Sequence, residues 1–322
     1  MKPLKFENIL KTIIWGGDQI CKFKGITPEL DGIGESWEIS QVEGNVSVVA
    51  DGEYKGKTLT EVMQKEGAAL MGKHVSEKYG ETFPLLIKFI DARDNLSIQV
   101  HPDDALAAAR HNSLGKTEMW YVISASEGAG LYSGFSQQIT PDEYVKRVEN
   151  NTITDVLSFH KVKSGDVFFL PAGRIHAIGK GIFIAEIQQS SNITYRIYDY
   201  NRKDKNGNTR ELHTELAKDA IDYKLYDDLL TTYTPASDKE VKLAECQYFV
   251  TNLLDVTSSV ECEIAKRDSF VIYICMGGEA TVTDSEGGVT PIKQGETILV
   301  PASTEKVTIT GKAKLLECYI PR

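Results

Sequence analysis

Short apolar segments, spaced like the strands of a barrel, recur along the whole chain. Residues 36–40 alternate between polar and apolar side chains, and residues 83–91 are rich in apolar, β-forming ones. Beyond residue 238 the helical periodicity disappears, and strand-like runs follow one another at short intervals. The pattern predicts a mainly β protein, with strands at residues 36–40, 46–49, 83–91, 96–101, 119–124, 270–275, 280–283, 297–300 and 315–320.

Segments of helical composition interrupt these strands. Thr140 precedes Pro141, and a threonine N-cap followed by proline is a common way to begin a helix. Asp103 precedes an alanine-rich segment in the same way and can cap it. The predicted helices are short insertions at residues 58–71, 103–110, 140–149 and 211–223.

A polar segment around Pro235 divides the chain into two predicted domains, residues 1–234 and residues 235–322. The run Gly165–Pro171 in the first domain is repeated, with the same glycine-to-proline spacing, by Gly295–Pro301 in the second. A histidine follows the first run, and a lysine stands at the equivalent offset after the second. We infer that the domains are repeats and that only the first holds a metal ion.

Composition and charge exclude some classes of partner. The formal net charge is −10 and no run of Lys or Arg appears, so no nucleic-acid partner is expected. The five cysteines form no Cys-x-x-Cys pair, which is typical of reduced thiols in a cytoplasmic protein. The sequence shows no signal peptide or membrane-spanning segment, so we expect a cytoplasmic protein without a membrane partner. Monomer and homodimer both remain open.

The residues Gly165–His176 predict a strand, a tight turn and an imidazole presented by the next strand. Gln99 and His101 are two residues apart, so their side chains lie on the same face of a strand. Glu118 lies in the next strand-like segment. Three strands of a small β-barrel would then hold one divalent cation between His101, Glu118 and His176, with Gln99 as a weaker, neutral fourth ligand. Mixed nitrogen and oxygen ligands suit Zn²⁺ best, although Fe²⁺, Mn²⁺ and Co²⁺ also accept them.

Each of these residues also has an ordinary structural interpretation. His101 could cap the helix that follows it, His176 could be a hydrogen-bonded core histidine, and Glu118 could lie on an exposed strand face. Their joint occurrence in strand contexts favours the metal site over three separate structural roles. The other histidines have no partner at a useful spacing and are expected to be structural or exposed; they are His74, His111, His160 and His213.

A set of motifs stands out by its order and spacing: residues 15–17, 34–39, 85–91, 96–103, 115–121, 165–176 and 186–199. Together they resemble the type I phosphomannose isomerases (mannose-6-phosphate isomerases) of the cupin superfamily, in the compact bacterial form. The resemblance covers essentially the whole chain and implies two cupin-type jelly-roll β-barrels, a bicupin, with short helical insertions. One departure is Lys116-Thr117-Glu118, where the family commonly has Lys-Pro-Glu.

The resemblance implies a reversible conversion of one sugar phosphate, mannose 6-phosphate, to fructose 6-phosphate with one Zn²⁺ per chain. It implies the ligands Gln99, His101, Glu118 and His176, and Arg196 as the catalytic arginine. Such an isomerisation moves a proton between C1 and C2 through an enediol. A metal that polarises the carbonyl oxygen contributes several kcal/mol to this step.

The residues leave open which group transfers the proton. Arg196 keeps its proton at any ordinary pH, so it suits charge stabilisation or phosphate binding better than base catalysis. Lys116 faces the same side of a strand as Glu118, where a nearby dication would lower its pKa. Glu186 is the competing base. Candidates for the substrate phosphate lie on or beside the matched strands and are Lys88, Ser97 and Arg202.

Two other functions are compatible with a cupin. An oxygenase or decarboxylase would use Fe²⁺ or Mn²⁺, but such sites usually begin with His-x-His, and Gln99 replaces the first histidine here. A non-enzymatic sugar-binding cupin would not need Lys116, Glu118 and Arg196 together. The isomerase is therefore the favoured function.

Overall fold

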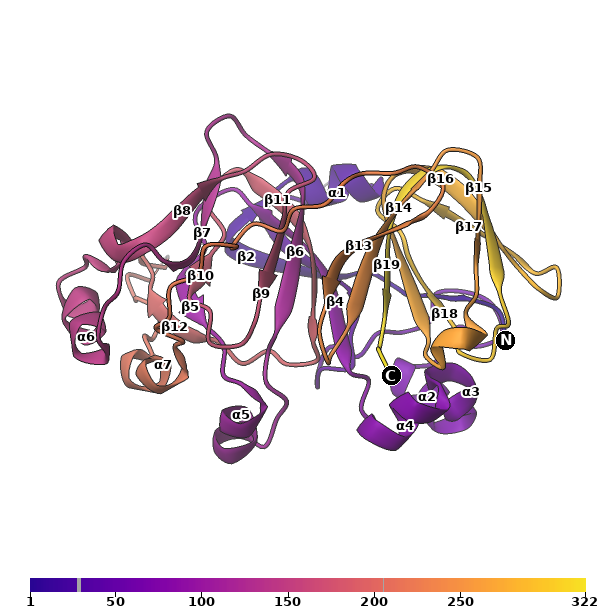
Figure 1. The fold of residues 1–322 in the computed structure, drawn as a ribbon, viewed down its shortest axis with the longest axis horizontal. Helices are drawn as coiled ribbons and strands as arrows, with labels where there is room; N and C mark the ends of the chain where they lie inside the picture. The colour runs from indigo at the N-terminus through magenta and orange to yellow at the C-terminus, as the bar shows by residue number, and fades with distance from the viewer. Residues whose placement is uncertain (28–29, 205) are drawn as a thin grey trace.

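The computed structural model describes residues 1–27, 30–204 and 206–322, and the strands within these ranges form three sheets. Figure 1 shows two β regions side by side, one from the first two-thirds of the chain and one, in orange and yellow, from the last third. Short helices lie around the sheets. The prediction of a mainly β chain is confirmed.

The N-terminal region is a sandwich of two sheets. Trp15, Trp120 and Ile184 of one sheet pack with Leu131 of the other in a shared apolar core. One sheet has the order β2 (Ile9–Gly17), β3 (Ile33–Ile39), β4 (Leu85–Ala92), β11 (Ile182–Gln189), β6 (Glu118–Ala125) and β9 (Val167–Leu170). The other has the order β12 (Tyr195–Tyr198), β5 (Ile98–Val100), β10 (His176–Ala177), β7 (Gly130–Phe135) and β8 (Leu157–Lys161).

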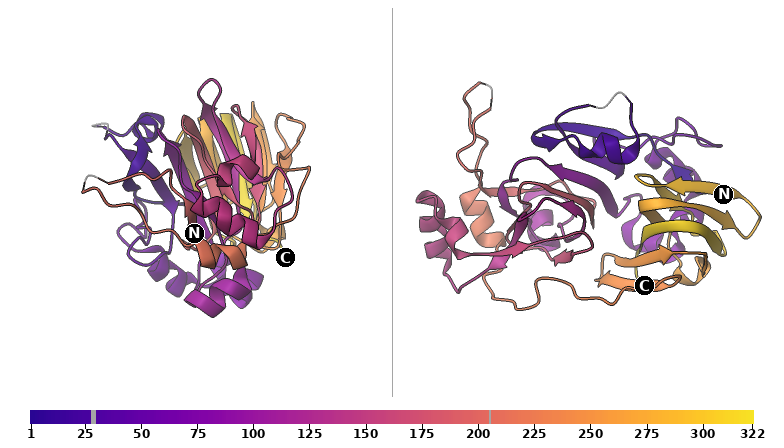
Figure 2. Two further views of the ribbon diagram at one scale, coloured as in Figure 1. Left: turned by 90° about the vertical axis from the view of Figure 1, so that its left-hand side faces the viewer. Right: turned by 90° about the horizontal axis from the view of Figure 1, so that it is seen from above.

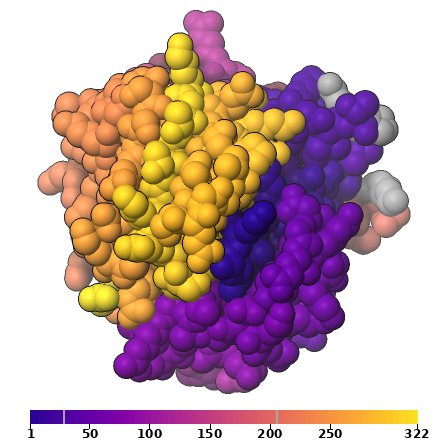
Figure 3. Space-filling model, turned by 90° about the vertical axis from the view of Figure 1, so that its right-hand side faces the viewer, coloured from indigo at the N-terminus to yellow at the C-terminus, as the bar shows by residue number. Residues whose placement is uncertain are grey.

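The C-terminal region is built on the third sheet. Its main order is β1 (Leu4–Lys5), β18 (Thr297–Val300), β16 (Val271–Asp284), β19 (Val307–Tyr319), β14 (Val250–Val256) and β13 (Glu240–Glu245), with β15 (Ser259–Cys262) on β19 and β17 (Val289–Lys293) on β16. Because β1 pairs with β18, the chain begins in the sheet of its own C-terminal region. Figure 3 shows this indigo N-terminal segment lodged between the yellow C-terminal strands and the purple helical segment.

The sheet that contains β4 and β11 is covered on both faces. Ile184 faces the core of the sandwich, whereas Ala185 and Ile187 face a second core that includes Ile272 and Leu316 of the C-terminal sheet. Every residue of β4 and β11 is buried, and the two strands are correspondingly apolar. Charged residues within them must therefore be paired or have a function.

The helices follow the predicted caps more closely than the predicted lengths. The side chains of Asp103 and Thr140 accept the N-cap hydrogen bonds of α5 and α6, as expected. The helix predicted at residues 58–71 divides at Gly67, whose φ of +52° breaks the helical geometry. The helices are α1 (Gln19–Lys24), α2 (Leu59–Glu66), α3 (Ala68–Met71), α4 (Lys73–Tyr79), α5 (Asp104–His111), α6 (Pro141–Glu149) and α7 (Thr214–Ala220).

Two further element predictions need correction, and two predicted strands are joined into one. The helix predicted at residues 211–223 is shorter, because only α7 forms. The strand predicted at residues 46–49 makes only isolated bridges, from Val48 to Thr58 and from Val49 to Phe6. The strands predicted at residues 270–275 and 280–283 are one long strand, β16. No helix in the described part of the chain is long and apolar enough to cross a membrane.

Candidate metal centre and active site

The site begins with a row of side chains across neighbouring strands of the five-stranded sheet. Arg196 on β12 is opposite Gln99 on β5, and Gln99 is opposite His176 on β10. Directly opposed residues place their side chains on the same face. The turn before His176 is fixed by Gly173, which has a φ of +87° and donates its N–H to the carbonyl of His101 at 2.9 Å. The turn thus ties the two histidines together.

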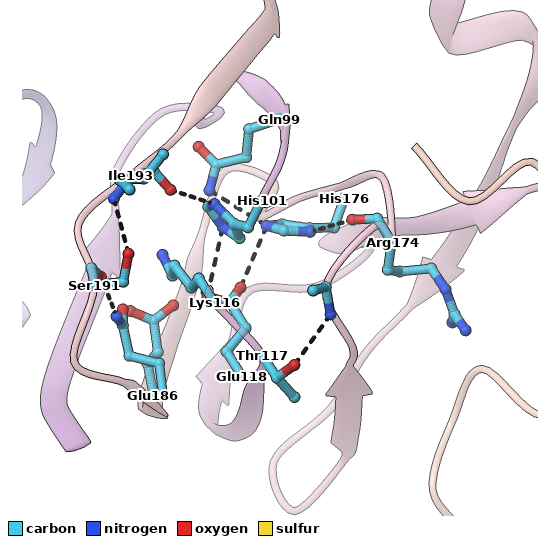
Figure 4. A network of polar contacts seen from close by, with 12 residues as sticks. Gln99, His101, Lys116, Thr117, Glu118, Arg174, His176, Glu186, Ser191 and Ile193 are labelled. Atoms are coloured by element: carbon cyan, nitrogen blue, oxygen red, sulfur yellow. Dashed lines mark hydrogen bonds and ion pairs between the residues drawn. The ribbon is translucent and has the colours of Figure 1, made fainter. Parts of the chain in front are cut away.

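Two histidines and a glutamate converge on one point. His176 Nε2 lies 3.2 Å from Glu118 Oε1, and His101 Nε2 lies 3.6 Å from Glu118 Oε2. Their ligand atoms all lie within 4.8 Å of one another, and all three side chains are buried. Gln99 reaches the same point, with its Nε2 atom 3.3 Å from His176 Nε2. Figure 4 shows these side chains directed toward a common centre.

The outer hydrogen bonds of the two imidazoles determine which ring nitrogen is available. His101 Nδ1 lies 2.8 Å from the carbonyl oxygen of Ile193, and His176 Nδ1 lies 2.8 Å from that of Arg174. A carbonyl oxygen only accepts, so each Nδ1 carries the proton and each Nε2 presents a lone pair. Both lone pairs point to Glu118. This is how protein histidines are commonly oriented toward a metal.

The converging atoms are poorly satisfied by the protein. His101 Nε2 and both Glu118 oxygens are buried without a well-formed hydrogen bond among the described residues, although the Lys116 ammonium lies 3.1 Å from Glu118 Oε2. Burial lowers the pKa of His101 well below its usual value and that of His176 to about 3, so both rings are neutral. Burial also raises the pKa of Glu118, against the opposing effect of Lys116. A divalent cation would satisfy all of these atoms.

A second buried pair of charges lies beside this cluster, on the sheet covered on both faces. Lys88 Nζ on β4 lies 3.0 Å from Glu186 Oε2 on β11, and Trp120 Nε1 donates to Glu186 Oε1 at 3.0 Å. Burial alone would raise the pKa of Glu186, but Lys88 and Lys116 outweigh it and lower the pKa. Glu186 is therefore a carboxylate at neutral pH.

A cavity of about 350 Å³ opens over these groups. It is large enough for a small metabolite, and charged and polar side chains line one part of its wall while Trp15 and Trp37 line another. The metal cluster adjoins the cavity through Gln99 and Lys116. The residues named from the sequence that line it are Lys88, Ser97, Gln99, Lys116, Glu186 and Arg196.

Arg202 is placed differently from the other sequence-predicted residues. It is not among the residues that line the cavity, and its guanidinium group instead contacts Asp199, Asp94 and the backbone oxygen of Asn95. Two residues that sequence reasoning missed, Arg210 and His213, do line the cavity. Arg210 lies in a polar segment without strand or helix periodicity, and His213 lies in the predicted helix 211–223 but precedes α7. Only their charge and hydrogen-bonding capacity could have drawn attention to them.

Comparison with known proteins identifies the family. Residues 4–121 match the model of the phosphomannose isomerase type I catalytic domain, and residues 239–320 match that of the mannose-6-phosphate isomerase cupin domain. Mannose-6-phosphate isomerase ManA of Bacillus subtilis is 34% identical over 99% of both chains. The chain belongs to the type I phosphomannose isomerase family.

Other members of the family are similar to this chain in sequence and in structure. A mannose-6-phosphate isomerase of Streptococcus mutans is 43% identical over 68% of each chain. The crystal structure of the mannose 6-phosphate isomerase from Bacillus subtilis superposes with a TM-score of 0.90 at 32% identity, covering 99% of this chain and all of that one. Membership in the type I phosphomannose isomerase family makes the chain an enzyme of the isomerase class, as the motifs predicted.

Proposed function

We propose that the enzyme interconverts mannose 6-phosphate and fructose 6-phosphate with one Zn²⁺ per chain. One observation carries the proposal. In a chain of this family, two imidazole nitrogens that each present a lone pair and a buried carboxylate converge beside a cavity of metabolite size. Two histidines, one carboxylate and a neutral amide form a donor set that Zn²⁺ accepts.

His101, Glu118 and His176 would hold the ion, with Gln99 as the fourth ligand. The Gln99 amide nitrogen faces His176, and a half-turn of the amide would direct its oxygen there instead. When bound, Zn²⁺ would supply a Lewis acid that polarises the carbonyl oxygen of the sugar. The sandwich interior around it excludes bulk water, so charged groups act strongly there.

Three residues of the chain have separate roles in the proposed proton transfer: Glu186, Lys116 and Arg196. Glu186 is a carboxylate on the cavity wall and is positioned to accept a proton from carbon as the enediol forms. Lys116, whose ammonium lies 3.1 Å from Glu118 Oε2, is positioned to move protons between the sugar oxygens. Arg196 contributes positive charge to the cavity and would stabilise negative charge on the substrate.

The predicted division into domains is part of the proposal. We propose that residues 1–234 and residues 235–322 form two cupin-type barrels, with Leu4–Lys5 of the first domain joined to the sheet of the second, and that only the first holds a metal ion. The five cysteines, all free, support a reducing cytoplasmic location. A monomer and a homodimer are both compatible with a site built from one chain.

A coupled assay for fructose 6-phosphate formed from mannose 6-phosphate tests the function. The pure protein should turn over the substrate, lose activity on dialysis against a chelator, and regain it with one equivalent of Zn²⁺. Elemental analysis should find one zinc per chain. Absence of turnover by the zinc-loaded protein would refute the activity, and oxygen uptake with Fe²⁺ or Mn²⁺ would favour a cupin oxygenase.

A further inference from the structure

Arg210 and His213 are among the cavity-lining residues to which the mechanism gives no role. After β12 the chain turns away, forms a hairpin closed by a bridge between Lys203 and Thr209, and returns to the cavity. The two arms of this hairpin, residues 202–204 and 206–209, project from the N-terminal region in the right-hand view of Figure 2. The return places Arg210 and His213 on the cavity wall with Arg196.

Arg210 is held rigidly at the base of the hairpin. The Asp199 carboxylate accepts hydrogen bonds from Arg210 Nε at 2.8 Å and from Arg210 Nη2 at 2.6 Å. Asp199 is only 5% exposed, whereas the side chain of Arg210 remains 31% exposed. An arginine fixed by such a two-point contact loses little rotamer freedom when it binds an anion.

His213 is locked to Arg196 through the backbone. The N–H of His213 donates to the carbonyl oxygen of Arg196 at 2.7 Å, and the N–H of Arg196 donates to His213 Nδ1 at 3.0 Å. Since Nδ1 accepts, the neutral imidazole carries its proton on Nε2. The carboxylate of Glu211 lies 3.9 Å from Nε2, beyond hydrogen-bonding distance. His213 Nε2–H is therefore a donor that a ligand can use.

The distribution of charge also points to an anion at this end of the cavity. Lys88 and Lys116 each face a carboxylate at about 3 Å, Glu186 and Glu118 respectively. Arg196 has no carboxylate partner within 4 Å among the described residues; its Nη1 donates to a backbone oxygen, and its buried Nε lacks a hydrogen bond. Burial and the nearby Arg210 both lower the pKa of Arg196. An anion between the two guanidinium groups would relieve this repulsion.

We propose that Arg210 and His213, together with Arg196, bind the phosphate group of the substrate. The inference rests on the proposed function. Arg196 is opposite Gln99, so this cluster lies next to the proposed metal ligands and extends away from them. A hexose 6-phosphate carries its phosphate at the end opposite to the reacting C1 and C2. The sugar would then lie between the metal centre and the arginine cluster, with its phosphate held by preorganised donors.

Arg210→Gln tests the first residue, with Arg110→Gln as a matched control. Arg110 also pairs with an aspartate, Asp219, but it is not among the cavity-lining residues. Loss of one charge-assisted contact should raise KM for mannose 6-phosphate about 10- to 100-fold and the inhibition constant of inorganic phosphate in parallel. The zinc content should stay at one per chain. Arg110→Gln should keep both constants within about threefold of wild type.

Two substitutions separate the roles of His213. Asparagine keeps an acceptor near the position of Nδ1 for the Arg196 N–H, but it has no donor at the position of Nε2. His213→Asn should raise KM and the phosphate inhibition constant about tenfold while kcat is largely kept. His213→Ala should lower kcat as well, because Arg196 loses its anchor. Wild-type constants in His213→Asn would show that His213 only positions Arg196 and would overturn its share of the proposal.

Failure of this inference is distinguishable from failure of the proposed function. A wild-type enzyme that does not convert mannose 6-phosphate refutes the function itself. Wild-type turnover with unchanged constants in Arg210→Gln refutes only the phosphate site. A raised KM in Arg202→Gln but not in Arg210→Gln would assign the phosphate to Arg202 instead.

Discussion

The two β regions share one five-stranded arrangement and differ in the polar side chains at its centre. The order β3-β4-β11-β6-β9 in the first matches β13-β14-β19-β16-β18 in the second. At matching positions, Glu186 on β11 is paired with Trp120, and Glu317 on β19 is paired with Tyr273. On the other neighbouring strand, Glu186 is paired with Lys88 of β4, and Glu317 is paired with Asn252 of β14. Each region therefore contains a glutamate flanked by hydrogen-bond donors on both neighbouring strands.

The turns that precede β9 and β18 extend the match. Gly165 and Gly295 both have positive φ, and each donates its N–H to the neighbouring strand, at Val122 and Cys275. In both turns an acidic side chain next to the glycine accepts a backbone N–H from three residues upstream. The repeat inferred from glycine and proline spacing is therefore a repeat of structure.

The two regions differ at the position of Glu118, a member of the candidate metal site. Glu118 is paired with Leu170, and the residue in the corresponding pair with Val300 is Val271. The second region thus lacks the central carboxylate of the first. Its own acidic cluster is already neutralised, because Arg267 lies 2.6 Å from Glu240 and 2.7 Å from Glu317. A guanidinium group thus stabilises the acidic cluster of the second core.

The largest expected effect comes from replacing His176, a proposed metal ligand that has no histidine counterpart in the second region. His176→Ala should abolish stoichiometric zinc and reduce kcat/KM by about a thousandfold or more, since several kcal/mol of carbonyl polarisation is lost. Lys306, at the equivalent offset in the second region, is exposed and pairs with Glu261. Lys306→Ala should change neither zinc content nor activity. Retention of one zinc per chain in His176→Ala would contradict the ligand assignment.

A matched pair of substitutions at the two equivalent glutamates comes next. Glu186→Gln and Glu317→Gln each leave a buried cation, Lys88 or Arg267, with one partner fewer, and each should cost about 3 kcal/mol of unfolding free energy. Only Glu186→Gln should also lower kcat, by about 10²- to 10⁴-fold, because only Glu186 faces the cavity. Denaturant unfolding and steady-state kinetics measure the two effects.

The two variants together test whether the regions share a scaffold but not a function. Comparable destabilisation with activity lost in only one variant would support a shared scaffold with divided functions. If Glu186→Gln kept full activity, the proton would be transferred by another group, with Lys116 as the next candidate. If Glu317→Gln lowered kcat without unfolding, the second region would take part in catalysis.

Local sequence patterns were enough to predict the parts of the site that lie on strands or directly beside them. Gln99 on β5 and His101 directly after it reach the same cluster, as their spacing of two predicted, and Gly173 fixes the turn that presents His176. The helix N-caps at Asp103 and Thr140 could also be predicted from the sequence, because a cap depends on a few neighbouring residues. Such features require no knowledge of the rest of the fold.

Features that depend on long-range pairing could not be predicted from the sequence. The segment 199–213 returns to the cavity through a hairpin, so the placement of Arg210 and His213 depends on contacts that no local pattern encodes. The pairing of β1 with β18 is likewise set by residues almost the whole chain apart. The motif order could indicate phosphate-binding candidates, but Asp199 contacts both Arg202 and Arg210, and of these two only Arg210 lines the cavity.

The smallest effects should come from the aromatic donors to the two glutamates. Tyr273→Phe removes one hydrogen bond to Glu317 and should cost about 1 to 2 kcal/mol of unfolding free energy with unchanged kinetics, because Asn252 and Arg267 still contact the carboxylate.

Trp120→Phe removes the corresponding donor to Glu186 and should act on kinetics as well. A carboxylate that loses a donor is less stable in its charged form, so the pKa of Glu186 rises. Because the proposed base must be ionised, the acid limb of the kcat/KM profile should move to higher pH, by about one pH unit. An unmoved acid limb in Trp120→Phe, with the profile of Tyr273→Phe as the reference, would mean that the ionisation of Glu186 does not limit catalysis. The two glutamates would then differ in surroundings only, and the base would have to be sought in the segment just before β6, which contains Lys116.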